Sequence, residues 1–191
     1  DRESMLILGR AFLVSLVGSG LMLLLHRLIG EGGFLLIEGE ADVKLLAKEY
    51  FYIRILAAPA TIGLYAFHGW FLGMQNARFP MYLTIFVNAI NIGLNFLFVY
   101  RFGMKSDGVA WATVIAQYSG LALALGLFYV PYRSFLRHLN WKDILDLPGL
   151  RHFFSVNSDI FIRTICLIFT LAFFTNQSSG IDPVVLAANT I

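Results

Sequence analysis

The chain has 191 residues, of which 58% are apolar and 14% are charged, and its net charge is +2. This composition lies outside the usual range for a soluble globular domain and indicates an integral membrane protein. The few charges are spread over predicted loops, so no basic block predicts a nucleic-acid partner. The one cysteine, Cys166, excludes an intrachain disulfide and a cluster of cysteine metal ligands.

Uncharged runs predict an all-α, polytopic transmembrane bundle. A spanning helix needs roughly 20 residues, and four runs come close to or exceed that length. The first run reaches it when residues 5–9 join the helix, with Arg10 snorkelling to the interface or facing other helices. We predict helices near residues 5–29, 49–74, 79–102, 108–130 and 151–176, and a further one that begins near residue 183. The start at Asp1 and the short final run suggest part of a longer protein.

The predicted loops differ in charge. Residues 30–48 form an acidic loop that begins with a glycine-rich turn at residues 30–33. Residues 133–151 form a basic loop whose apolar residues, Trp141, Ile144, Leu145 and Leu147, suggest a short amphipathic helix at the membrane surface. The excess of Lys and Arg on this side predicts that loop 133–150 is cytoplasmic.

Proline and small residues shape the predicted helices. Pro59 should bend the second helix, with Arg54 snorkelling or bonding to the carbonyls that the proline leaves free. Two patterns of small residues predict close helix packing: the pair Gly69 and Gly73, and a stripe made of Ala116, Gly120 and Ala124.

Polar residues recur along one side of the third predicted helix. Asn88, Asn91 and Asn95 are spaced i, i+3 and i+7, and Thr113 and Gln117 on the next helix are placed to face them. Amides are costly in hydrocarbon, so this side must face other helices or a water-filled cavity. Two interpretations stay open: interhelical hydrogen bonds worth about 1 kcal/mol each, or a site for a cation or a substrate.

Charged residues within the fifth predicted helix form a second candidate. Asp159 and Arg163 are spaced i, i+4, which favours an ion pair that is either structural or part of coupling. The sequence contains no catalytic motif and no spacing typical of metal ligands. We therefore expect no enzyme activity, no metal and no cofactor.

Several blocks resemble the multidrug and toxic compound extrusion (MATE) family, in its DinF-like branch, which takes its name from DNA-damage-inducible protein F. The resemblance rests on Tyr52-Ile53-Arg54 with Pro59, the run from Gly69 to Pro80, Asn88 to Phe96, Asp107 to Thr113, Asn157 to Thr164, and Leu186 to Asn189.

This resemblance implies two lobes with twelve transmembrane helices, of which the chain would hold the third to seventh and the start of the eighth. Residues 1–132 would then be the second part of the N-terminal lobe, 133–150 the cytoplasmic inter-lobe loop, and 151–191 the start of the C-terminal lobe. In relatives, a polar cluster combines an Asp on the first helix with residues that correspond to Asn91, Asn95 and Thr113. The first-helix Asp would lie outside this chain, and Asn95 stands where an Asp is common. An amide does not titrate, so Asn95 can bind a cation but cannot carry a proton.

The resemblance further implies an inner-membrane antiporter, monomeric when full length, that exports amphipathic or cationic compounds against protons or sodium ions by alternating access. Two alternatives stay open. A lipid-linked saccharide flippase has a related architecture but would need a cavity lined by several arginines, and this chain offers Arg54 and Arg163. A non-transporting membrane subunit would use the asparagines only for helix packing.

Overall fold

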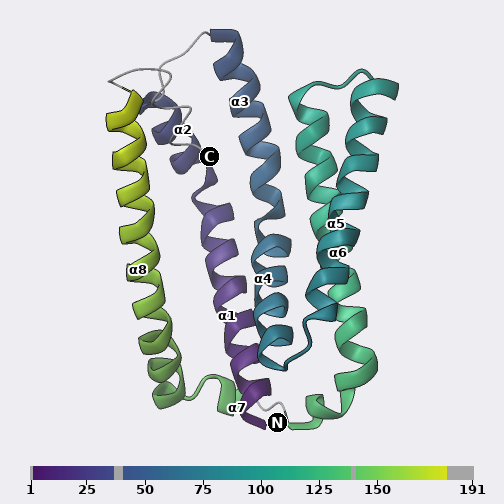
Figure 1. The fold of residues 1–191 in the computed structure, drawn as a ribbon, viewed down its shortest axis with the longest axis vertical. Coiled ribbons are helices and arrows are strands. Elements are labelled where there is room, and N and C mark those ends of the chain that lie inside the picture. The colour runs from purple at the N-terminus through teal and green to yellow at the C-terminus, as the bar shows by residue number, and fades with distance from the viewer. Residues whose placement is uncertain (1, 37–40, 139–140, 180–191) are drawn as a thin grey trace. The chain divides into compact units, whose positions relative to one another are not determined.

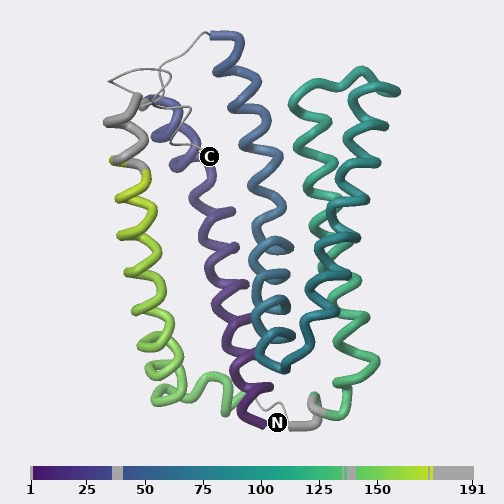
Figure 2. Tube along the Cα trace, viewed as in Figure 1, coloured from purple at the N-terminus to yellow at the C-terminus, as the bar shows by residue number. Residues whose placement is uncertain are grey.

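A computed structural model describes residues 2–36, 41–138 and 141–179 of the chain. All regular structure in these residues is helical (Figures 1 and 2). Five of the described helical segments are long and apolar enough to cross a membrane: Arg2–Leu24, Ala41–Gly73, Arg78–Arg101, Ser106–Tyr132 and Leu147–Leu171. The predicted all-α bundle with five spans is confirmed, whereas the helix predicted from residue 183 lies outside the described residues.

The first prediction of helix limits was partly wrong. Helix α1 covers Arg2–Leu24, and α2 then runs over His26–Leu36, where we expected an acidic loop and a glycine-rich turn. Backbone hydrogen bonds of 2.9 Å from Leu25 to Leu21 and from Ile29 to Leu25 continue the helical pattern across the junction. Gly30 serves close packing rather than a turn, because a Cβ there would lie 2.8 Å from the Tyr52 hydroxyl.

The second span begins earlier than predicted and is interrupted near its middle. Helix α3 covers Ala41–Arg54, a stretch of good helix formers with Asp42 in its first turn, which suits the helix dipole. A 3₁₀ turn, Ile55–Ala57, then leads into α4, Ala58–Gly73. Pro59 has no N–H for the Ile55 carbonyl, and the Ala58 N–H bonds to that carbonyl instead.

The side-chain partner at this interruption is not the one expected. The Tyr118 hydroxyl donates to the Leu56 carbonyl at 3.0 Å. Arg54 forms no hydrogen bond or ion pair with any described residue. A 3₁₀ turn thus precedes Pro59, the residue where a bend was predicted, and Tyr118 satisfies the neighbouring Leu56 carbonyl.

Short connections join α4 to the two helices that follow it, so each helix runs antiparallel to the one before it. Helix α4 ends in a Schellman motif, in which Asn76 N–H bonds to the Phe71 carbonyl and Gln75 adopts a φ of 57°. Helix α5 covers Arg78–Phe96 and continues as the π-helical segment Leu97–Arg101, labelled η2. Helix α6 covers Ser106–Tyr132 and packs against α3, α4 and α5 (Figure 1).

The small-residue stripe of α6 is buried as predicted. Ala116 and Ala124 are fully buried, and a Cβ at Gly120 would overlap Val87 of α5 and approach Leu64 of α4 to 3.2 Å. Gly120 therefore lies where α4, α5 and α6 pack closely together. The Gly69 and Gly73 prediction was wrong, because both glycines are exposed and a Cβ on either would meet no atom of another described residue within 4 Å.

An aromatic cluster joins the start of α1 to the ends of α4 and α6. The fully buried Phe71 has ring centroids of Phe79 and Phe67 within 5.2 and 5.7 Å. The Trp70 ring stands edge-on to Tyr132 at 4.9 Å, and its indole N–H donates to the Ser4 carbonyl at 2.8 Å. Ring packing and this hydrogen bond fix the start of α1 against α4.

The final part of the chain begins with short elements. A 3₁₀ helix, η3, covers Arg133–His138, α7 covers Trp141–Ile144, and α8 covers Leu147–Ser179. The predicted amphipathic helix is thus shorter than expected and excludes Leu145 and Leu147. Helix α8 begins before the predicted residue 151 because Asp146 caps it, accepting the Gly149 N–H at 3.1 Å.

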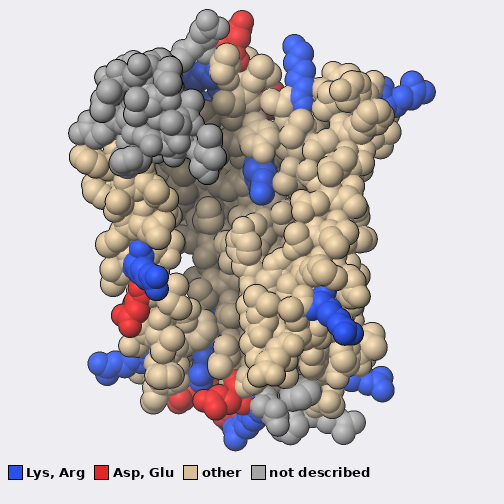
Figure 3. Space-filling view, in the orientation of Figure 1, with Lys and Arg blue, Asp and Glu red and all other residues tan. Residues whose placement is uncertain are grey.

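The chain divides into two compact units, Asp1–Ile144 and Leu145–Ile191. The described part of the second unit is dominated by α8, whose side chains are largely exposed. On the face drawn in Figure 3, uncharged side chains cover most of the surface; charged side chains occur near both ends of the helices, and a few also lie between them. This distribution fits helices that cross a bilayer. The assignment of the two units to the two lobes of a transporter stays a prediction.

Candidate functional site

The candidate site lies between α5 and α6, where three polar side chains form a hydrogen-bonded chain. Asn95 Nδ2 donates to Asn91 Oδ1 at 3.0 Å, and Asn91 Nδ2 donates to Thr113 Oγ1 at 3.0 Å. Thr113 in turn donates to the Val109 carbonyl at 2.9 Å, one turn earlier in α6. We call Asn91, Asn95 and Thr113 the amide network. It joins the two helices across their interface.

Two features bring the side chains of this network together: helical spacing within α5 and the close approach of α5 and α6. Asn91 and Asn95 are one turn apart on α5 and therefore share a face. Thr113 lies on a part of α6 that is rich in small residues, where Ala110, Ala112 and Ala116 are fully buried. Small residues let helix backbones approach, which brings the threonine hydroxyl within reach of the asparagine.

One acceptor of the amide network has no partner. Asn95 Oδ1 is buried and accepts no hydrogen bond from any described residue. A buried polar atom without a partner costs roughly 1–3 kcal/mol. The network therefore ends in a carbonyl oxygen that is available to a cation or to a donor group.

The helix changes its geometry directly beyond this acceptor. The π-helical segment η2 begins at Leu97, two residues after Asn95, and contains the Phe102 N–H to Leu97 carbonyl bond of 3.2 Å. Single π turns within α-helices are rare and often occur at functional sites. The position of η2 next to Asn95 supports a functional role for this end of α5.

Two residues predicted for the site do not join the network. Asn88 is exposed, and Gln117 is partly buried one turn after Thr113. Neither forms a hydrogen bond with a described residue. The structure therefore brings together three of the five predicted polar residues.

The second predicted pair remains apart in α8. Asp159 and Arg163 are both exposed, and the ion pair found among the described residues joins Arg2 to Asp143 instead. A helix lets the long arginine side chain point away from a neighbour four residues earlier, and no hydrogen bond or ion pair to a described residue of the second unit holds it. A role for either residue stays a prediction.

Two further buried polar atoms and a mostly apolar cavity occur in the first unit. A cavity of about 310 Å³ lies between α1, α3 and α4 and is lined by Arg54 and Thr61, among others. Thr61 Oγ1 and His68 Nε2, seven residues apart on α4, are buried and have no hydrogen-bond partner among the described residues. Their common helix face was a signal that the sequence already contained. No cluster of three or more metal-ligating side chains occurs in the described part of the chain.

Comparisons with known proteins agree on one family. The sequence model of the family described as MatE matches residues 3–97. DNA damage-inducible protein F of Escherichia coli (strain K12) is 29% identical over 186 residues, which cover 96% of this chain and 40% of that protein. No solved structure gives a significant match.

Plant proteins show the same similarity over shorter stretches. Protein DETOXIFICATION 45, chloroplastic, of Arabidopsis thaliana is 31% identical over 116 residues, covering 59% of this chain and 21% of that protein. Protein DETOXIFICATION 43 of the same plant is 34% identical over 113 residues, covering 59% of this chain and 20% of that protein. The chain thus spans two fifths or less of the length of these relatives.

Long apolar helices with a polar network between two of them define a multi-pass helical membrane protein. Within that class, the chain belongs to the MATE family and to its DinF-like branch.

Proposed function

We propose that the protein is a secondary active efflux transporter, which exports amphipathic or cationic compounds against protons or sodium ions by alternating access. Its family and the names of its relatives, which refer to detoxification, support export of harmful compounds. We further propose that it acts as a monomer in a bacterial inner membrane, with residues 133–150 on the cytoplasmic side. As a transporter it would need no catalytic residue.

The observation that carries this proposal is Asn95 Oδ1 at the end of the amide network, which is buried and has no hydrogen-bond partner in the described part of the chain. A network used only for packing would satisfy its buried atoms, since each unpaired one is costly. Asn91 Oδ1 and Thr113 Oγ1 each accept one hydrogen bond and retain a lone pair. Three side-chain oxygens are thus close together, a chemistry that suits a cation or a polar substrate group.

The composition of the network limits how coupling can occur. Asn91, Asn95 and Thr113 do not titrate, so none of them can take up the proton in a proton-driven cycle. They can supply oxygens to a sodium ion or hold the carboxylate that titrates. That carboxylate would come from another part of the complete protein, as the family resemblance implies.

The test uses the complete gene product in host cells exposed to a cationic dye. Asn91→Ala and Asn95→Ala should each lower dye efflux at least several-fold, because each removes an oxygen from the network. Asn88→Ala is the matched control, since Asn88 lies on the same helix but outside the network. Immunoblots should show equal amounts of all variants in the membrane. Unchanged efflux in both network variants would refute the site.

A further inference from the structure

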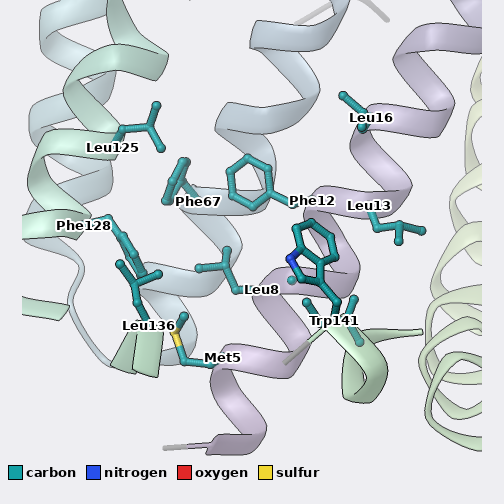
Figure 4. A pocket seen from close by; sticks show the side chains of 12 residues that line it. Met5, Leu8, Phe12, Leu13, Leu16, Phe67, Leu125, Phe128, Leu136 and Trp141 are labelled. Atoms are coloured by element: carbon teal, nitrogen blue, oxygen red, sulfur yellow. The ribbon is translucent and has the colours of Figure 1, made fainter. Parts of the chain in front are cut away.

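An apolar groove lies on the first unit, away from the amide network. It encloses about 410 Å³ between α1, α4, α6, η3 and α7, a volume within the roughly 300–1,000 Å³ typical of small-ligand sites. Its wall is almost entirely hydrocarbon, and Figure 4 shows side chains such as Phe12, Phe67 and Phe128 converging on it from different helices. Among the described residues, this groove has no occupant.

The length of the groove along α1 suits an extended hydrocarbon chain. Along α1 the lining runs from Met5 to Leu16, a rise of about 16 Å at 1.5 Å per residue. That length matches one leaflet of a hydrocarbon core that is roughly 30 Å thick.

A cation with unused hydrogen-bond donors lies at one side of the groove. Arg10, next to the lining residue Gly9, donates to the Asp143 carbonyl at 3.1 Å and to the Ile144 carbonyl at 3.4 Å. A guanidinium has five N–H donors, so most of its donors remain available. The nearby carboxylate of Asp143 is paired with Arg2 at 2.7 Å, and Arg10 has no anionic partner among the described residues.

The same end of the groove has features of a membrane interface. Helix α7 carries Trp141, whose ring projects into the groove beside Leu13 while 70% of the residue remains exposed (Figure 4). Tryptophan favours the boundary between headgroups and acyl chains, because its ring is apolar and its N–H is polar. A ligand here would have its polar end near Arg10 and α7 and its apolar end towards Leu16.

We propose that this groove binds an anionic phospholipid, with one acyl chain along α1 and the phosphate on Arg10. Basic pockets between membrane helices at the cytoplasmic surface bind acidic headgroups in this way. The lipid would bridge α1, α6 and α7 within the first unit. This proposal does not depend on the transported compound.

The experiment measures lipids retained by the complete gene product. The protein, purified in mild detergent, is mixed with equal amounts of phosphatidylglycerol and phosphatidylethanolamine and examined by native mass spectrometry. We expect one phosphatidylglycerol to be retained at least tenfold more than phosphatidylethanolamine. Equal retention of both lipids, or of neither, would overturn the proposal without bearing on the amide network.

Variants locate the bound lipid. Leu13→Trp should fill the groove and reduce phosphatidylglycerol retention at least tenfold, whereas Val17→Trp, one turn further and 63% exposed outside the groove, should not. Arg10→Gln should abolish the preference for phosphatidylglycerol, and Arg10→Lys should restore part of it. Retention unchanged in Leu13→Trp would place the lipid elsewhere. A disulfide that forms between a cysteine at position 13 and another helix of the protein would show that protein, not lipid, fills the groove.

Discussion

The two ends of the first unit are built on different chemistry. At one end, aromatic rings of α4 and α6 surround the start of α1, with Phe71 fully buried and Trp70 bonded to Ser4. At the other, the amide network joins α5 to α6 by one side-chain hydrogen bond and ends in an oxygen without a hydrogen-bond partner among the described residues. Dense ring packing fixes helices in one arrangement, whereas an incomplete polar network can gain a ligand. The first end thus has the features of a support and the second those of a binding site.

The largest expected effect is on stability at the aromatic end. Phe71→Ala should lower the free energy of unfolding of the complete gene product by about 3 kcal/mol, because it leaves a cavity among packed rings. Phe96→Ala, near the amide network but 68% exposed, should change it by less than about 0.5 kcal/mol. Titration with denaturing detergent in mixed micelles measures both. Equal losses would contradict the distinction between the two ends.

A smaller effect is expected where the two ends meet. Gly120→Leu should destabilise the protein by about 2 kcal/mol, since the added side chain must displace Val87 and Leu64. Gly126→Leu adds the same side chain to the same helix where a Cβ would meet no described neighbour within 4 Å. The same detergent titration should show little change for this control. A stable Gly120→Leu protein would mean that α4, α5 and α6 pack less closely than described.

The smallest expected effect concerns the amide network itself. Asn91→Ala, Thr113→Val and the double variant should reveal a coupling energy of about 0.6 kcal/mol, the usual value for a hydrogen bond between membrane helices. Dye efflux should fall far more than this energy predicts, because the lost oxygens would bind the ion or substrate. Additive stability changes would show that Asn91 and Thr113 do not interact. A loss of efflux no larger than that of an equally destabilised aromatic-end variant would argue against a binding role.

The sequence by itself determined the number of spans and the face that carries the polar residues. Long uncharged runs have few options in a bilayer other than helices, because every backbone polar group needs an internal partner. Helical periodicity then places Asn91 and Asn95 together on α5. Errors arose at the helix ends, where residues 30–36 and 41–48 form helices instead of a loop, since charge and glycine content say little about helical continuity.

Only the tertiary structure decided which polar groups meet and which remain open. Asn88, Asn91 and Asn95 share a helix face by their spacing, yet Asn91 is the one that bonds to Thr113 of α6. Asn95 bonds to Asn91, and its Oδ1 has no hydrogen-bond partner among the described residues. Likewise, the carbonyls of α7 determine where the Arg10 guanidinium lies. Periodicity fixes the direction of a side chain from its own helix, but its partners depend on the distance to a neighbouring helix, which side-chain packing sets.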